Sequence, residues 1–198
     1  MSADGALARL IRSSSERAAA AATEVCELCA APVPDEHPHL YDTAEAQVRC
    51  VCRPCSVLFP GNRAGGGTLR LVPSRRKRLR AVDTAALGVP VGLVFFVPHA
   101  DGTVTAQGPS PAGAMRWGVD AAAWRRTTEA CPELAAMEPD VEALLVNSAR
   151  GMDHHWIVPV DDCFRMVAVV RREWRGLSGG GRVWPAVQEF FDGLTERG

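Results

Sequence analysis

The most continuous hydrophobic stretch of the chain spans residues 91–97 and reads V-G-L-V-F-F-V. Its β-branched and aromatic residues predict the strongest strand in the protein. The Asp-Gly dipeptide at 101–102 is a hairpin turn signal, so residues 103–107 are expected to return as an antiparallel partner. The prolines within 109–111 then predict the end of this hairpin.

Weaker strands and several helices are predicted around this hairpin. Residues 68–73, 141–147 and 155–160 favour strands, and a short helix is expected over 81–87. Apolar residues recur at helical spacing in three longer stretches, two of which follow an acidic residue suited to an N-cap. The expected helices run over 121–131 after Asp120, from Asp161 or Asp162 to about Trp174, and over 183–194.

Turn-forming residues divide the chain into four regions. Residues 1–23 form a flexible or helical tail with one short apolar stripe, and residues 24–62 form a cysteine-rich module that ends in a Pro-Gly-Asn turn. Residues 63–80 read as a linker that includes three consecutive glycines and a basic run. Residues 81–198 then make a domain of ordinary size.

Composition narrows the class of protein. The 198 residues are 47% hydrophobic and 23% charged, with a net charge of −1, which is typical of a globular chain that no global field draws to nucleic acid or membrane. The longest apolar stretch, residues 87–98, is too short for a membrane span, and the N-terminus lacks the apolar core of a signal peptide. A cytoplasmic protein is expected, in which closely spaced cysteines indicate metal or redox chemistry rather than disulfides.

Two C-x2-C pairs carry the strongest chemical signal. Cys26 and Cys29 are separated by twenty-two residues from Cys52 and Cys55, a spacing typical of a four-thiolate tetrahedral site. Zinc is the usual occupant of such closed sites, and its binding would supply much of the folding energy of so small a module. The predicted fold is therefore α+β: a zinc-ribbon or treble-clef-like module with four cysteine ligands, followed by an α+β domain with a small antiparallel or mixed sheet.

Alternatives remain open for the metal and its ligands. Iron, in a rubredoxin-like centre or an iron–sulfur cluster, also takes four cysteines. Cys50, His37 and His39 lie between or beside the two pairs. They are either alternative ligands for the same ion or, respectively, a plain hairpin residue and two exposed imidazoles of a Pro-rich loop. Arg49 and Arg53 are expected to offset the negative charge of four thiolates.

Other polar clusters carry weaker signals. Arg75, Arg76, Lys77 and Arg78 form a basic run that suits contact with a partner, although nucleic acid is disfavoured because no aromatic residues interleave with it. The Asp-His-His sequence at 153–155 is read as a loop that enters a strand. No nucleophile motif accompanies it, so a non-enzymatic protein is expected.

Several motifs in combination resemble an uncharacterised, mainly actinobacterial family. These are C-E-L-C-A at 26–30, E-H-P-H-L at 36–40, R-C-V-C-R-P-C-S-V-L-F at 49–59, E-P-D-V-E-A-L-L at 138–145 and W-R-G-L-S-G-G at 174–180. Genes of that family lie in clusters for uptake [NiFe]-hydrogenases. The resemblance implies an accessory protein whose partner is a hydrogenase subunit or maturation factor, but no catalytic residue.

Three functions are therefore expected in turn. The first is a non-enzymatic, zinc-stabilised accessory protein for hydrogenase assembly or maturation, acting through protein contacts. The second is an iron-containing electron carrier. The third is a nucleic-acid-binding regulator that uses the cysteine module and the basic run.

Overall fold

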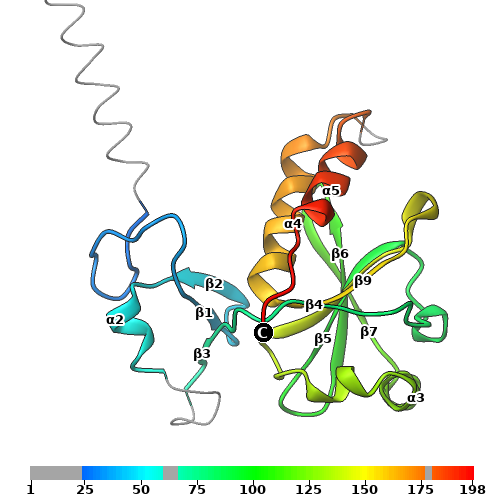
Figure 1. Cartoon of the computed structure of the whole chain (residues 1–198), viewed down its shortest axis with the longest axis horizontal. Coiled ribbons are helices and arrows are strands. Elements are labelled where there is room, and N and C mark those ends of the chain that lie inside the picture. The colour runs from blue at the N-terminus through cyan, green and yellow to red at the C-terminus, as the bar shows by residue number, and fades with distance from the viewer. Residues whose placement is uncertain (1–23, 60–66, 177–179) are drawn as a thin grey trace, which may run out of the picture. The chain divides into compact units, whose positions relative to one another are not determined.

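The structure, a computed structural model, describes residues 24–59, 67–176 and 180–198 (Figure 1). The tail expected over residues 1–23 lies outside this part of the chain. The chain divides into two compact units, residues 1–71 and residues 72–198, and each is described by itself.

The first unit is a small antiparallel sheet beside a single helical turn. Strand β1 (His39–Asp42) pairs with β2 (Gln47–Cys50) on one side and with β3 (Leu69–Leu71) on the other. Helix α2 (Arg53–Ser56) follows β2 closely. The buried cluster of this unit is small and consists of Cys26, Val33, Leu40 and Val51.

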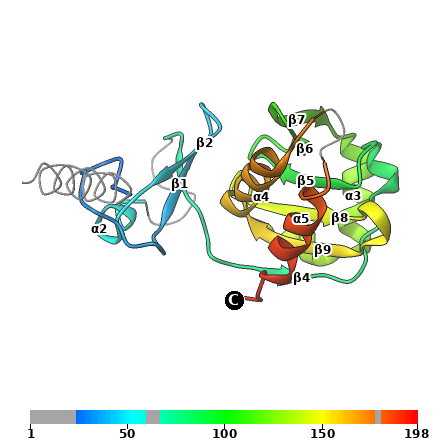
Figure 2. The same ribbon diagram turned by 90° about the horizontal axis from the view of Figure 1, so that it is seen from above.

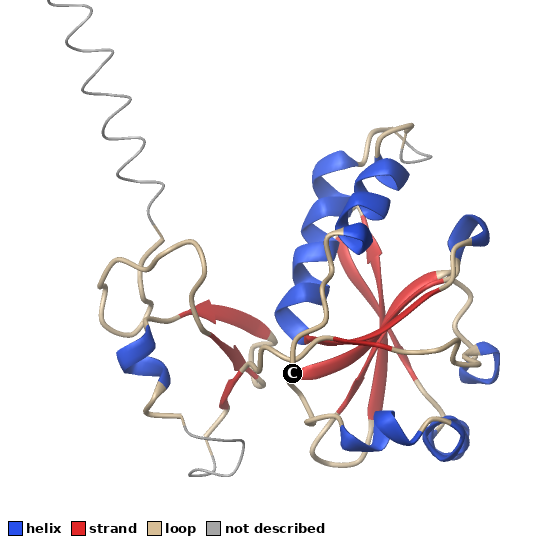
Figure 3. Cartoon of the chain, in the orientation of Figure 1, coloured by secondary structure: helices blue, strands red, loops and turns tan. Residues whose placement is uncertain are grey.

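The second unit is built on a six-stranded sheet, drawn in red in Figure 3, with strand order β4-β9-β8-β5-β6-β7. Every pairing in it is antiparallel. The strands are β4 (Lys77–Arg78), β5 (Leu93–Pro98), β6 (Val104–Ser110), β7 (Gly113–Gly118), β8 (Glu142–Asn147) and β9 (His154–Pro159).

Helices cover both faces of this sheet, which explains why its central strand is apolar throughout. Successive side chains of a strand point to opposite faces. Phe95 packs against Phe164 of one helix, with ring centroids 6.2 Å apart, and Phe96 packs against Trp124 of another at 6.1 Å. Figure 2 shows α4 and α5 together along one side of the sheet. The helices are α3 (Ala121–Ala130), α4 (Val160–Glu173) and α5 (Val183–Asp192), with 3₁₀ turns η1 (Ala85–Leu87), η2 (Pro132–Ala136) and η3 (Ala149–Gly151).

Most of the predicted elements are confirmed. The mixed α+β class is correct, the hairpin of β5 and β6 turns at the expected Asp-Gly dipeptide, and β8 and β9 fall on the weaker strand candidates. Helix α3 begins after Asp120, whose Oδ1 accepts a hydrogen bond from the Ala123 N–H at 2.8 Å. Helix α5 also lies where it was expected.

Three predicted boundaries are wrong. The prolines within 109–111 do not end the hairpin, because β6 continues to Ser110 and pairs with β7, where Pro109 lies opposite Ala114. Helix α4 begins at Val160 with Pro159 as its N-cap, ahead of the two aspartates expected to cap it. The helix expected over 81–87 is only the 3₁₀ turn η1.

Candidate metal centre

The first cysteine pair lies in a tight turn before the sheet of the first unit. The Ala30 N–H donates to the Cys26 carbonyl at 2.7 Å, and the Cys26 N–H donates to the Ala31 carbonyl at 2.8 Å. Ala30 has a left-handed backbone conformation with φ of 59°. These bonds fold the segment back on itself, so that Cys26 and Cys29 face the same point.

The second cysteine pair opens helix α2. Cys52 is the N-cap residue, Pro54 occupies the first turn, and the Ser56 N–H donates to the Cys52 carbonyl at 3.0 Å. Proline suits this position because the first helical N–H groups have no intrahelical acceptor. The order along the chain is therefore a turn, a hairpin and a short helix.

The four sulfur atoms converge on a single point. The Sγ atoms of Cys26, Cys29, Cys52 and Cys55 all lie within 4.8 Å of one another. Those of Cys29 and Cys52 are 3.6 Å apart. Tetrahedral zinc with Zn–S bonds of about 2.3 Å places its sulfur atoms about 3.8 Å apart. The four cysteines therefore lie close enough to bind a metal with little rearrangement.

The local environment shifts the pKa values of the thiols in different directions. Burial alone raises the pKa of Cys26, but N–H donors from Cys52, Leu28 and Cys29 outweigh it and lower the pKa to about 6. By contrast, hydrogen bonding to the Cys52 and Cys29 side chains raises the pKa of Cys55 to about 12. One thiolate forms readily, and a bound cation is what would allow the others to ionise beside it.

Arg49 does not serve the cysteines as expected. Its guanidinium lies 3.1 Å from Asp42 Oδ2, 2.6 Å from Glu45 Oε2 and 3.5 Å from Glu27 Oε2. The Arg49 hydrogen bond lowers the pKa of Asp42, although burial acts in the opposite direction as the largest single influence. The charge of Arg49 is thus engaged by carboxylates, and backbone N–H groups are the donors that reach the Cys26 sulfur.

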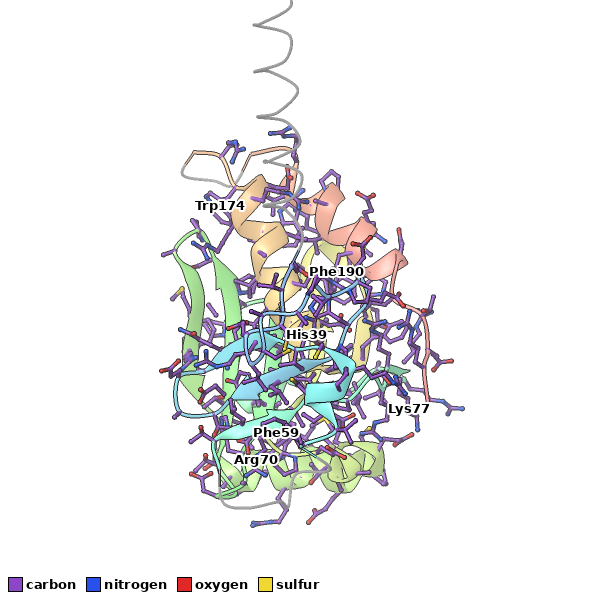
Figure 4. All side chains as sticks on the ribbon, turned by 90° about the vertical axis from the view of Figure 1, so that its left-hand side faces the viewer. His39, Phe59, Arg70, Lys77, Trp174 and Phe190 are labelled. Carbon is purple, nitrogen blue, oxygen red and sulfur yellow. The ribbon has the colours of Figure 1, made fainter. Side chains whose placement is uncertain are left out.

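The alternative ligands form a group of their own. The ligand atoms of His37, His39 and Cys50 lie within 4.8 Å of one another, in a cluster separate from that of the four cysteines. The sequence offered these three residues only as alternative ligands for the ion of the four cysteines. Cys50 at the end of β2 lies opposite His39 at the start of β1, and Figure 4 labels His39.

The first half of the basic run has intramolecular partners. Arg75 donates to the two carboxylate oxygens of Glu142 at 2.7 and 2.6 Å, and Arg76 donates to those of Asp162 at 2.5 and 2.9 Å. Both acids are 1% exposed. Lys77 and Arg78, on edge strand β4, are exposed, and Figure 4 labels Lys77. Two of the four residues therefore have a structural role that the sequence did not indicate.

Two histidines of the second unit, His99 and His155, also have structural partners. His155 Nδ1 accepts from the Val82 N–H at 3.3 Å, and its Nε2 lies 2.9 Å from Asp153 Oδ1. His99, which sequence reasoning passed over, lies between Asp140 Oδ1 and Thr105 Oγ1 at 2.9 Å each. Thr105 and Asp140 lie far apart in the chain, so no local signal could have revealed this row of hydrogen bonds.

A surface hollow of about 440 Å³ lies beside β9 and α5. His154, stacked on Phe191 with ring centroids 4.9 Å apart, and Trp156 both line it.

Elsewhere in the unit Cys163 is fully buried, and burial raises the pKa of its thiol well above the usual value. Cys163 is therefore part of the core of this unit.

Fold and site together define a mixed α+β protein with antiparallel sheets and a four-cysteine cluster that could bind a metal. The chain belongs to DUF5947, a family of unknown function whose profile matches residues 25–198. No curated protein and no solved structure matches it. Within the part of the chain that the structure describes, no helix has both the length and the apolar character needed to cross a membrane.

Proposed function

We propose that this chain is a non-enzymatic accessory protein, stabilised by zinc at the four cysteines, that assists the assembly or maturation of a [NiFe]-hydrogenase through protein contacts. The observation that carries the proposal is the convergence of four Sγ atoms within 4.8 Å. Four thiolates complete the tetrahedral shell of zinc, so this ion would have a structural role rather than a catalytic one. The hydrogenase setting rests on the family resemblance of the sequence motifs.

Exposed apolar side chains support a role in protein contacts. Val57 and Leu58, directly after the second cysteine pair, are 69% and 71% exposed, and Leu28, inside the first pair, is 42% exposed. Large apolar side chains that remain in water next to a rigid centre are typical of a binding surface. A metal that holds the two cysteine turns would also hold these side chains in place for a partner. Lys77 and Arg78 offer a second contact surface, in the other unit.

The metal is tested first, by elemental analysis and an absorption spectrum of the full chain. Colourless protein that contains zinc and loses it when Cys29 or Cys52 is replaced by serine supports the proposal. A coloured protein that contains iron would replace it with the electron carrier, because iron–thiolate centres absorb visible light. Cys131→Ser is the matched control, since Cys131 lies in the other unit and is expected to leave the metal content unchanged.

The partner is tested by co-purification of the full chain from a hydrogenase-expressing host. Recovery of a hydrogenase subunit or maturation factor is expected, with loss of hydrogenase activity in a deletion strain. A Val57→Ser, Leu58→Ser double variant should lose the partner and keep its zinc. Met115→Ser, at an exposed apolar site in the second unit, should keep both. Normal hydrogenase activity in the deletion strain, with no hydrogenase component recovered, would contradict the accessory role.

A nucleic-acid function gains no support from the basic run. Arg75 and Arg76 direct their guanidinium groups at buried carboxylates of their own chain. A run that grips phosphate needs those groups in solvent.

A further inference from the structure

The group formed by His37, His39 and Cys50 is distinct from the four-cysteine cluster and has no part in the function proposed above. These three residues come from the segment before β1, the first position of β1 and the last position of β2. Their ligand atoms lie within 4.8 Å of one another. Two imidazoles and a thiol are ligands that borderline transition metals such as zinc prefer.

The backbone holds two of the three side chains face to face. His39 lies directly opposite Cys50 in the antiparallel pair of β1 and β2. The Val51 N–H donates to the Pro38 carbonyl at 3.0 Å, while the N–H and carbonyl of Cys50 bond to Glu27 at 2.7 and 2.9 Å. His39 and Cys50 are therefore a non-hydrogen-bonded pair, the kind whose Cα atoms approach to about 4.5 Å and whose side chains lie closest.

A hydrogen bond made by Nδ1 of His37 orients the ring so that Nε2 can act as a metal ligand. Its Nδ1 lies 2.8 Å from the Pro34 carbonyl oxygen, which only accepts hydrogen bonds, so the ring hydrogen is on Nδ1. In the neutral ring Nε2 then carries a lone pair. Metal-bound histidines are commonly held in this way, with the remote N–H donating to a backbone carbonyl.

The lone pair on His37 is buried and has no hydrogen-bond donor. The side chain of His37 is 3% exposed, and no hydrogen-bond partner reaches its Nε2 atom. A buried acceptor without a donor is costly, so it calls for an explanation. The edge-to-face contact of the His37 and His39 rings, with centroids 4.7 Å apart, brings the rings together but satisfies no lone pair. A cation bound among the three ligands would satisfy it.

We propose that His37, His39 and Cys50 form a second metal site, which binds zinc or a similar divalent transition metal. Three protein ligands leave one of the four tetrahedral positions to water, unlike the closed site of the four cysteines. Glu24, with its Oε2 atom 3.6 Å from His37 Nε2 and its side chain 61% exposed, supplies negative charge beside the ion. The two sites of the small unit thus differ in kind: one is closed, and the other is open to an exchangeable ligand.

The test is a cobalt titration of the full-length apoprotein, because Co²⁺ reports its ligands in its absorption spectrum. Two classes of site are expected, at about one ion each per chain, with the stronger thiolate charge-transfer band from the four cysteines. His37→Asn keeps an N–H that can donate to the Pro34 carbonyl but removes Nε2. His37→Asn should therefore abolish only the second class of cobalt-binding site, the one without the stronger charge-transfer band. His39→Asn should do the same.

Cobalt binding at the four cysteines, the first class of site, serves as the internal check on folding in both variants. An unchanged charge-transfer band from the four cysteines shows that the unit still folds. His154→Asn, in the other unit, is the matched control and should keep about two ions per chain. A single class in the wild-type chain would overturn the proposal, as would two classes in both His37→Asn and His39→Asn. Either result would leave the four-cysteine site intact, so the two proposals fail separately.

Discussion

The two units of this chain contain very different amounts of hydrophobic core. In the first, the buried cluster consists of four side chains, one of which is Cys26 of the four-cysteine cluster. In the second, a single buried cluster contains thirteen side chains, including Phe96 and Leu144 of the sheet. Burial of apolar surface stabilises a fold roughly in proportion to area, at about 25 cal/mol per Å². The second unit has the means to fold by packing, whereas we expect the first to depend on a bound ion.

Removal of the metal should therefore produce the largest difference in stability between the two units. Structural zinc contributes about 10–16 kcal/mol to the folding of small zinc modules, far more than four buried side chains supply. Chelation under reducing conditions should unfold residues 24–59 and leave residues 72–198 folded. Hydrogen exchange followed by mass spectrometry measures both units in one sample.

The Cys29→Ser variant should reproduce this pattern without a chelator, while Cys131→Ser should not. Retained amide protection in residues 24–59 after complete loss of metal would contradict the comparison, since the small core would then suffice.

Phe96→Ala should produce the converse effect. Phe96 is fully buried between the sheet and Trp124, so truncation is expected to cost about 3–5 kcal/mol through lost burial and the cavity left behind. All five tryptophans lie within residues 117–184, so tryptophan fluorescence during urea unfolding reports on the second unit alone.

The zinc content of Phe96→Ala should equal that of the wild type, because the packing partners of Phe96 lie within residues 72–198. The exposed Met115→Ala is the control and should change stability little. Loss of zinc in Phe96→Ala would show that the units do not fold independently.

Glu142→Gln should show how far buried ion pairs add to the core of the second unit. The Glu142 carboxylate accepts two hydrogen bonds from Arg75 and one from the Glu138 N–H at 2.7 Å. Glutamine keeps one acceptor oxygen but loses the charge, so we expect a cost of about 2 kcal/mol in urea unfolding. The pair of Lys77 and Glu133, 3.5 Å apart and nearly half exposed, provides the contrast.

Lys77→Gln should cost well under about 1 kcal/mol, because water already solvates an exposed pair. Equal losses in Glu142→Gln and Lys77→Gln would mean that the Arg75 pairing adds nothing beyond a surface contact.

The four-cysteine site could be predicted from the sequence because its signal is local. Each C-x2-C turn places two sulfurs by short-range geometry, and only the approach of the two turns to each other depends on tertiary structure. The second group had no such signal. His39 and Cys50 become neighbours only through the register of β1 and β2, which the sequence did not specify.

Long-range pairing explains most of the other differences. Arg75 and Glu142 are 67 residues apart and Arg76 and Asp162 are 86 apart, so the sequence suggested that the whole basic run suits contact with a partner. Strand β7 was missed because the prolines within 109–111 normally end a strand. Beyond Gln107, however, β6 pairs only with β7. The side of β6 that faced β5 has no strand partner there among the described residues, so no N–H donor is needed on that side at Pro109.

The smallest effect expected is a gain in stability at the first cysteine turn. Ala30 has φ of 59°, a conformation that is strained for residues with a Cβ atom and free of strain for glycine. The relief, about 1–2 kcal/mol, is reduced by the greater backbone entropy of glycine in the unfolded chain. Ala30→Gly should therefore strengthen zinc retention by a net factor of about two to five in competition with a chelator. Ala31→Gly, next to it and without a positive φ, carries only the entropic cost and should weaken retention. Equal retention in the two variants would show that the left-handed turn does not contribute to the metal-bound state, and that the first unit depends on its sulfur atoms alone.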